Sequence, residues 1–247
     1  MKQSSHPSQE TKLKVIAGIP CFNTESSIAD VVSKAKKYVD QVIVIDDGSH
    51  DGTAEAARAA GALVTNHGTN RGYGKAIKSC FEAAKANNAN VLVILDGDGQ
   101  HKPDEIPLLL APILKGEADL IIGSRFLTKD VNMPRYRKFG ISVITLLWNL
   151  GSRTKVSDAQ SGFRAYRREA FQSFSLAEKG MSVSIETLEN ARRKGAIIKE
   201  IPTSCLYVPS TFNLKAIRHG LSVALSVVRI RLKNSLHSLI RGNNARN

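Results

Sequence analysis

The sequence predicts an α/β protein built on a mostly parallel central sheet with helices on both faces. Short apolar runs alternate with segments of helical periodicity from residue 14 to residue 125, and this order specifies a parallel sheet. The runs are rich in β-branched residues, as strands covered on both faces usually are. Several of them end in polar or acidic residues, and open sheets of this kind bind ligands at the carboxyl ends of their strands.

Each expected element follows from a local pattern. The apolar runs predict strands at 14–19, 41–46, 62–65, 91–95 and 119–123. Apolar residues at helical spacing predict helices at 26–38, 53–60, 75–86, 103–115 and 138–150. Ser26 and Ser27 are suitable N-caps for the first helix. The last helix is apolar around most of its circumference, so it is either deeply packed or in contact with lipid.

Composition limits the class of protein. The chain has 247 residues, 42% of them hydrophobic, which is enough for the core of one large α/β domain. Its three cysteines are far apart and indicate neither a disulfide framework nor a zinc site. We expect a flexible leader at 1–11, one domain at 12–205 and a basic helical tail at 206–247, with no secretory signal and no transmembrane helix.

The tail contributes much of the formal net charge of +13, because no Asp or Glu follows Glu200. Apolar residues recur in steps of three and four from Leu214 to Leu239, which predicts one or two basic amphipathic helices. Such a helix suits an anionic membrane surface, but it also suits packing on the domain or on a second copy in a homo-oligomer. The tail has almost no aromatic residues for base stacking, so no nucleic-acid partner is expected.

The run 91–95 ends at Asp96, Gly97 and Asp98. Two carboxylates one residue apart can share a divalent cation, and such a cation commonly also binds phosphate oxygens. For this motif alone, a plain turn after a strand is the alternative. Two other runs also end in polar side chains, Asn23 in one case and Asp46 with Asp47 in the other, which favours a binding crevice at one edge of the sheet.

Several motifs occur in a fixed order along the chain. They are Ile19-Pro20-Cys21-Phe22-Asn23-Thr24-Glu25, Asp46-Asp47-Gly48-Ser49, Asn70-Arg71-Gly72, Asp96-Gly97-Asp98-Gly99-Gln100-His101, Ile122-Gly123-Ser124-Arg125 and Ser161-Gly162-Phe163-Arg164. Together they resemble the inverting glycosyltransferases of family 2 with the GT-A fold, and most of all the polyprenyl-phosphate (dolichyl-phosphate) hexose synthases.

The resemblance implies a nucleotide-sugar donor, a UDP- or GDP-hexose, that lies across the strand ends. The donor-binding residues would be Pro20, Phe22, Asn23, Glu25, Asp46, Asp47, Arg71, Asp96 and Gln100. Asp96 and Asp98 would hold Mg²⁺ or Mn²⁺ on the diphosphate, and Arg125 would lie near the leaving diphosphate. The chemistry needs such groups, because breaking the sugar–phosphate bond leaves negative charge on the diphosphate.

The resemblance also implies an acceptor side. Arg137, which precedes the apolar helix at 138–150, would bind the phosphate of a polyprenyl phosphate, with Ser161 nearby. Asp158 is the candidate acid/base residue. A phosphate acceptor is already ionised, so the alternative for Asp158 is to orient the acceptor or a basic neighbour.

The expected function is metal-assisted transfer of one hexose, with inversion, to a polyprenyl phosphate by a cytoplasmic protein held peripherally at the inner face of the membrane. The chain lacks the Q-x-x-R-W motif of processive polysaccharide synthases, which indicates transfer of a single sugar. The alternative hypothesis is the same chemistry with a soluble or protein-linked glycan as the acceptor. A more remote hypothesis is that the chain is a basic nucleic-acid-binding protein.

Overall fold

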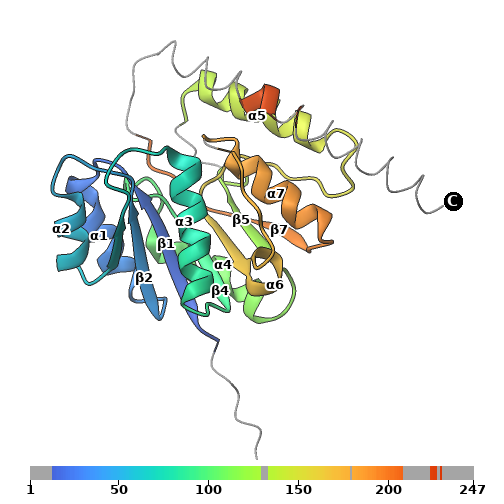
Figure 1. Cartoon of the computed structure of the whole chain (residues 1–247). Helices are drawn as coiled ribbons and strands as arrows, with labels where there is room; N and C mark the ends of the chain where they lie inside the picture. The colour runs from blue at the N-terminus through green and yellow to red at the C-terminus, as the bar shows by residue number, and fades with distance from the viewer. Residues whose placement is uncertain (1–12, 129–132, 179, 208–222, 227–228, 230–247) are drawn as a thin grey trace, which may run out of the picture.

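The structure is a computed structural model, and it describes residues 13–128, 133–178, 180–207, 223–226 and 229 (Figure 1). Its centre is a seven-stranded sheet with the strand order β3-β2-β1-β4-β6-β5-β7. The strands are β1 (Val15–Cys21), β2 (Gln41–Asp46), β3 (Leu63–Asn66), β4 (Val91–Ile94), β5 (Leu120–Ser124), β6 (Arg164–Arg167) and β7 (Ile198–Pro202). The helices are α1 (Glu25–Ala35), α2 (Thr53–Ala59), α3 (Tyr73–Ala86), the short 3₁₀ helix η1 (Pro103–Glu105), α4 (Ile106–Leu114), α5 (Arg135–Asn149), α6 (Arg168–Phe171) and α7 (Val183–Arg193).

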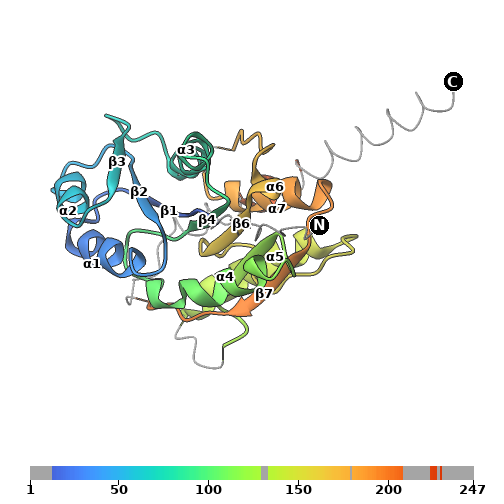
Figure 2. The same ribbon diagram turned by 90° about the horizontal axis from the view of Figure 1, so that it is seen from below.

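The prediction of a mostly parallel sheet with helices on both faces is confirmed. Helices α3, α6 and α7 cover one face, and α1, α2 and α4 cover the other (Figure 2). Strand β1 shows how one sequence serves both layers: Ile16 packs in the first core cluster, whereas Ala17 and Ile19 pack in the second. Successive side chains of a strand point to opposite faces, so an unbroken apolar run fills two cores at once.

Strand β6 was not predicted, and it is the antiparallel member of the sheet. It lies between β4 and β5, where Ala165 is opposite both Val93 and Ile121. Its four residues begin and end with arginine, so the run has no apolar stretch of the usual length. Strand β7 and helices α6 and α7 were also missing from the sequence prediction.

The start of the first helix was predicted wrongly. Helix α1 begins at Glu25 with Thr24 as its N-cap, so Ser26 and Ser27 lie inside the helix. The Ser27 hydroxyl instead donates to the Gly97 carbonyl at 2.7 Å. This hydrogen bond ties α1 to the turn that follows β4.

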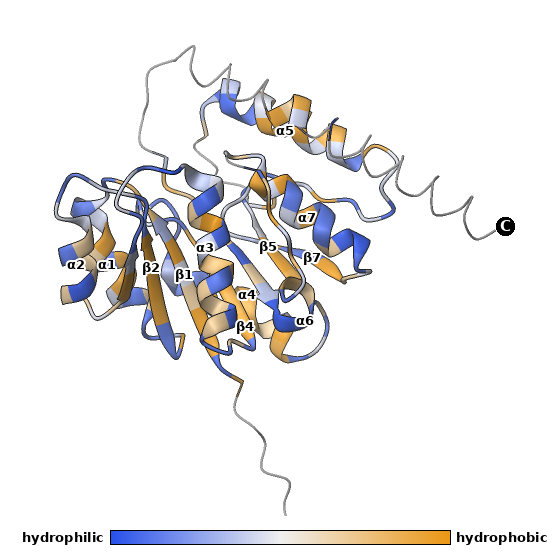
Figure 3. Cartoon of the chain, viewed as in Figure 1, coloured by the Kyte–Doolittle hydropathy of each residue, from blue (hydrophilic) through white to orange (hydrophobic). Residues whose placement is uncertain are grey.

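Helix α5 is neither fully buried nor fully exposed. Ile144 and Trp148 pack in the core, whereas Phe139 is 72% exposed and Leu146 is 60% exposed. Figure 3 shows the resulting hydrophobic colouring along α5, which lies apart from the helices that cover the sheet. The helix therefore has two apolar sides, of which one faces away from the core.

Only a small part of the predicted tail is described by the structure. Residues 223–226 are helical, and Val223 is buried in the same cluster as Ile144 and Trp148. The rest of the predicted amphipathic pattern, like the leader at 1–11, lies outside the described residues. Within the described part of the chain, no helix has the length and apolar character needed to span a bilayer.

Candidate active site

A cleft of about 990 Å³ opens at the carboxyl ends of the parallel strands. The predicted site residues that line it are Pro20, Phe22, Asp47, Asp96, Asp98, Gln100, Arg125 and Arg137. The predicted residues that do not line it are Asn23, Glu25, Asp46, Arg71, Asp158 and Ser161. The fold thus gathers eight of the predicted residues, which come from segments spread over more than a hundred positions, around one cavity.

Asp96 lies two residues after the end of β4, and neighbouring residues hold its carboxylate in place. The Tyr73 hydroxyl, at the first residue of α3, donates to Asp96 Oδ1 at 3.0 Å. Gly162 leaves room for the other oxygen, because a Cβ there would lie 2.7 Å from Asp96 Oδ2. Burial, and then the nearby charge of Asp98, raise the pKa of Asp96 to about 6. The hydrogen bond from Tyr73 and the charge of Arg125 offset this shift only in part, so the negative charge of Asp96 is incompletely compensated.

Asp98 is more exposed, and its Oδ1 accepts a hydrogen bond from the Gln100 backbone N–H at 3.0 Å. Partial loss of solvent raises the pKa of Asp98, while the positive charge of Arg137 opposes that shift. Arg137 on α5 and Asp98 after β4 consequently face the same space from different elements. The cleft thus has an anionic wall, formed by Asp96 and Asp98, and a cationic wall, formed by Arg125 and Arg137.

The donor set fits a hard divalent cation that binds a phosphate at the same time. Asp96 and Asp98 offer carboxylate oxygens, which Mg²⁺ and Mn²⁺ prefer, and a cation would relieve their mutual repulsion. In the described part of the chain, no cluster of three or more His, Cys, Asp or Glu side chains is arranged to hold a metal ion. The pair therefore suits a cation whose remaining ligands come from elsewhere, such as diphosphate oxygens and water.

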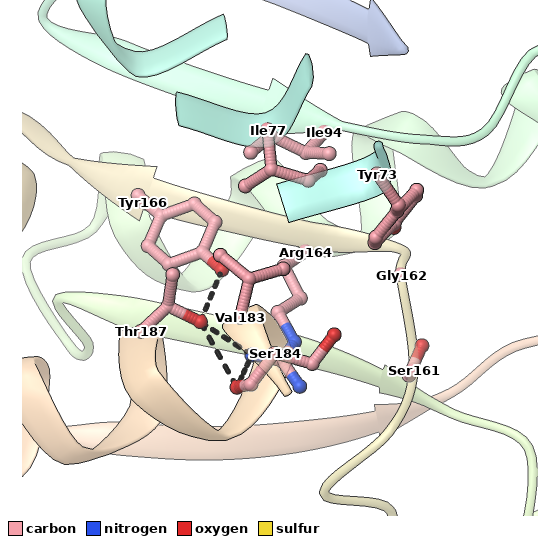
Figure 4. Close-up of a pocket in the computed structure, with 10 residues that line it drawn as sticks. All are labelled: Tyr73, Ile77, Ile94, Ser161, Gly162, Arg164, Tyr166, Val183, Ser184 and Thr187. Atoms are coloured by element: carbon pink, nitrogen blue, oxygen red, sulfur yellow. Dashed lines mark hydrogen bonds between the residues drawn. The ribbon is translucent and has the colours of Figure 1, made fainter. Parts of the chain in front are cut away.

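A buried arginine supports the turn behind this pair (Figure 4). Arg164 is 2% exposed, and it donates to the Ser184 carbonyl at 2.7 Å and to the Ala159 carbonyl at 2.8 Å. These bonds tie the turn at 159–162 to helix α7. Ser161 is fully buried, and it lines a cavity of only about 10 Å³ beside Arg164 instead of the cleft.

The two acids at the end of β2 lie in different surroundings: Asp46 is the last residue of the strand, and Asp47 follows it. Asp46 is buried, and it accepts from the Ser49 backbone N–H at 3.0 Å and from Asn66 Nδ2 at 2.6 Å. Asp47 lines the cleft, and it accepts from the backbone N–H groups of Arg71 at 3.0 Å and Gly72 at 2.8 Å. Asp46 therefore shapes the turn, whereas Asp47 fixes the loop that leads into α3.

Three other predicted donor residues lie outside the cleft lining, and two of them, Asn23 and Glu25, make structural contacts through their side chains. Asn23, with a φ of 52°, accepts from the His50 backbone N–H at 2.9 Å through its side-chain oxygen. Glu25 accepts from the Gly52 backbone N–H at 3.1 Å. Arg71 has an exposed side chain outside the cleft lining. Asn23 and Glu25 thus fix the segment next to Phe22, which is 41% exposed.

Arg125 and Asp158 form a buried ion pair at the end of β5. Arg125 Nε donates to Asp158 Oδ2 at 2.7 Å, and Nη2 donates to Oδ1 at 2.9 Å. Burial alone would raise the pKa of Asp158, but the hydrogen bonds and charge of Arg125 outweigh it and hold that pKa below its usual range. Asp158 is thus ionised and engaged through both oxygens, which disfavours a role as a general base.

Among the other residues that line the cleft are Tyr73, His101 and Tyr207, to which the sequence interpretation gave no binding or catalytic role. Tyr73 opens α3 directly after the Asn70-Arg71-Gly72 motif, so its place beside that motif was a usable signal. His101 is 4% exposed, and its burial lowers the pKa of the imidazole to about 3, so this ring is neutral. Tyr207 lies beyond β7 in a segment with no helical or strand periodicity, so no pattern in the sequence pointed to it.

Comparison with known proteins agrees with this geometry. Residues 17–174 match the sequence profile of the family described as "Glycosyl transferase family 2". The chain is 30% identical over 214 residues to the UDP-N-acetylglucosamine–dolichyl-phosphate N-acetylglucosaminyltransferase of Methanococcus voltae, covering 76% of this chain and 84% of that one. It is 30% identical over 202 residues to the undecaprenyl-phosphate mannosyltransferase of Micrococcus luteus, covering 77% and 82%.

A similar solved structure is glucosyl-3-phosphoglycerate synthase from Mycobacterium tuberculosis in complex with Mn²⁺ and UDP-glucose. Its TM-score is 0.68 at 24% identity, over 90% of this chain and 79% of that one. The fold is therefore that of the GT-A nucleotide-sugar transferases, as the sequence predicted. The chain belongs to glycosyl transferase family 2, and it is a glycosyltransferase.

Proposed function

We propose that the protein transfers one hexose from a nucleotide-sugar to a polyprenyl phosphate, with inversion and with the assistance of Mg²⁺ or Mn²⁺. The observation that carries this proposal is the pairing of two charged walls in one cleft. Asp96 and Asp98 form the anionic wall, and Arg125 and Arg137 form the cationic wall. Such a cleft suits two phosphate-bearing substrates, one held through a cation and the other held directly.

On the donor side, Asp96 and Asp98 would hold the cation, which neutralises charge on the diphosphate when bound. Pro20 and Phe22 line the part of the cleft next to β1, where the nucleoside would lie. Asp47 keeps the loop at 70–72 in place beside it through two backbone N–H groups. The donor would therefore lie across the ends of β1, β2 and β4.

Arg125 would stabilise the negative charge that develops as the sugar–phosphate bond breaks. Its orientation is set in advance by Asp158, which occupies Nε and Nη2. A fixed donor costs little reorganisation at the moment of reaction, which is why such arginines are effective. Asp158 would thus act as a positioning residue.

On the acceptor side, Arg137 would bind the acceptor phosphate. A phosphate oxygen is already ionised at neutral pH, so its attack on the sugar requires no general base. This agrees with the engagement of both Asp158 oxygens by Arg125. Two relatives are named for dolichyl-phosphate and undecaprenyl-phosphate acceptors, and these names support a lipid acceptor here.

A second acceptor class has its own supporting observation. The M. tuberculosis synthase has a structure in complex with phosphoglyceric acid, a small water-soluble phosphate. A cationic wall made of Arg125 and Arg137 would also bind a phosphate of that kind. Transfer to a soluble acceptor is therefore the alternative that the experiment below must separate from the lipid reaction.

The exposed side of α5 supports a peripheral position at the inner face of the membrane. Phe139 and Leu146 project from a helix that begins with Arg135, Arg137 and Lys138. Apolar side chains beside cations suit the boundary of an anionic leaflet. The same helix lines the cleft, so a lipid acceptor would reach Arg137 from the membrane.

A donor screen with separated products tests the proposal. Purified protein with Mn²⁺ or Mg²⁺ is incubated with UDP- and GDP-sugars, with and without a polyprenyl phosphate, and released nucleotide is measured. We expect release that depends on the lipid phosphate and is abolished by Asp98→Ala. Undiminished release in Asp98→Ala would remove the proposed metal role, and release with soluble acceptors alone would favour the alternative.

A further inference from the structure

Tyr207 lies between the two arginines of the cationic wall. Its hydroxyl accepts a hydrogen bond from Arg125 Nη1 at 3.0 Å. The guanidinium carbon of Arg137 lies 5.8 Å from the centre of its ring. One side chain therefore contacts both cations, each through a different part of the tyrosine.

The segment that carries Tyr207 is attached to the loop of the anionic wall. The Leu206 backbone N–H donates to the Gln100 carbonyl at 2.8 Å. Next to this hydrogen bond, His101, which follows Gln100, and Cys205, which precedes Leu206, form an isolated antiparallel bridge. Tyr207 is thus held at a fixed place relative to Asp98, which is two residues before Gln100.

The remaining hydrogen-bonding capacity of Arg125 is limited. A guanidinium has five N–H donors, and Asp158 takes one edge of this one through Nε and Nη2. Tyr207 meets Nη1, which lies on the other side of the group. Asp158 and Tyr207 together therefore fix the directions in which the remaining N–H groups of Nη1 and Nη2 point.

We propose that Tyr207 is a positioning residue that holds Arg125 and Arg137 together as one binding site for the acceptor phosphate. This inference rests on the proposed function: both arginines would hold the acceptor phosphate before the reaction, and Arg125 would also face the diphosphate charge that develops as the sugar–phosphate bond breaks.

The physical basis is the repulsion between two guanidinium groups that share one wall. The phenolic oxygen offers a lone pair to Arg125, and the negative face of the ring attracts Arg137. Burial raises the pKa of Tyr207, so the group is a neutral phenol that keeps both properties at neutral pH. A phosphate with two negative charges then meets two cations that are already in place.

The test compares three full-length variants with the parent protein: Tyr207→Phe, Tyr207→Leu and Tyr38→Phe. Tyr207→Phe removes the acceptor for Arg125 and keeps the ring, whereas Tyr207→Leu removes both. Tyr38→Phe is the matched control, because the Tyr38 hydroxyl bonds Asp104 at 2.8 Å on the surface. Binding of farnesyl phosphate and of inorganic phosphate is measured by calorimetry in EDTA, and binding of UDP is measured with Mn²⁺.

We expect the Kd for farnesyl phosphate to rise about fivefold in Tyr207→Phe and about thirtyfold in Tyr207→Leu. The Kd for UDP should rise less in both variants, because its diphosphate would meet Arg125 but not Arg137. Tyr38→Phe should behave like the parent. A purely structural role would instead weaken both ligands together and lower the Tm. Unchanged phosphate binding in Tyr207→Leu, or no phosphate binding by the parent, would overturn the inference.

The binding measurements, combined with the transfer assay of the donor screen, separate this inference from the proposed function. If the parent transfers no sugar to a polyprenyl phosphate but its phosphate binding still weakens in the Tyr207 variants, then the pairing of the arginines stands and the lipid acceptor is wrong. If transfer occurs and phosphate binding is insensitive to Tyr207, then the acceptor stands and the role of Tyr207 is wrong.

Discussion

Arg125 and Asp158 are joined at two points inside the protein, by Nε to Oδ2 at 2.7 Å and by Nη2 to Oδ1 at 2.9 Å. Asp158→Asn leaves the buried cation without its counter-charge, so we expect the free energy of unfolding to fall by about 3 kcal/mol. Urea unfolding at neutral pH measures this change. Asp30→Asn, in an exposed pair with Lys34, is the control and should cost less than about 1 kcal/mol.

The same variant separates a positioning role from a base role. If Asp158 only orients Arg125, then kcat falls about tenfold or more while the pH dependence of the rate keeps its shape. A general base would instead be revealed by loss of the acidic limb of the pH–rate profile in Asp158→Asn. Steady-state rates from about pH 5 to about pH 9 distinguish the two.

The stability of the metal-free protein should depend on pH through Asp96. Its pKa is about 6 in the folded state against an ordinary value of 3.8, so the folded state binds this proton more tightly. The stabilising contribution is therefore complete below about pH 4 and is lost as the pH rises through about 6. Asp96→Asn should raise the free energy of unfolding by roughly 3 kcal/mol at about pH 7.5 and by much less at about pH 4. Urea unfolding in EDTA measures both values, and no gain at the higher pH would contradict the prediction.

Gly162 is expected to tolerate no side chain, because of its contact with Asp96. A Cβ would lie 2.7 Å from Asp96 Oδ2 and 3.1 Å from the Tyr73 hydroxyl. We expect Gly162→Ala to displace the carboxylate and to weaken Mn²⁺ binding about tenfold, as measured by electron paramagnetic resonance of free Mn²⁺. Gly180→Ala is the control, since a Cβ there meets nothing within 4 Å. Equal Mn²⁺ affinity in the two variants would show that Gly162 does not set the position of Asp96.

The exposed side of α5 should be needed for membrane binding and not for folding. Phe139→Glu combined with Leu146→Glu should lower binding to vesicles rich in phosphatidylglycerol about tenfold or more, with little change in Tm, because both side chains are mostly exposed. Leu108→Glu combined with Leu114→Glu adds the same charge to exposed positions of α4 and is the matched control. Vesicle flotation measures the effect, and an equal loss in both pairs would indicate charge alone.

The parallel half of the fold could be predicted because each of its central strands is an apolar run that is recognisable in the sequence by itself. The apolar runs of β1, β2 and β4 each fill two cores, so local composition and global position agree. Strand β6 could not be predicted in the same way, since its pairing with β4 and β5 depends on contacts distant in sequence. Propensity is weak for four residues that include two arginines.

The site shows the same division. Asp96, Asp98 and Arg125 were accessible to prediction because each lies shortly after the carboxyl end of a strand at the ligand edge. The alternative role of Asp158, to orient a basic neighbour, is the one that agrees with its contacts, but the sequence did not identify Arg125 as that neighbour, because a residue type and its spacing do not reveal which partner an oxygen will have. Tyr207 joins the site through the bridge between His101 and Cys205, which is visible only once the chain is folded.

The most direct test of the proposed function is to follow the sugar. The purified protein is incubated with Mn²⁺, a radiolabelled UDP- or GDP-sugar that the donor screen identifies, and equal amounts of a polyprenyl phosphate and of soluble phosphorylated acceptors, and the products are partitioned between organic and aqueous phases. We predict that the label enters the organic phase as a single sugar on the lipid phosphate, and that both Asp98→Ala and Arg137→Gln prevent this. Label that remains in the aqueous phase, attached to a soluble acceptor, would contradict the proposed acceptor.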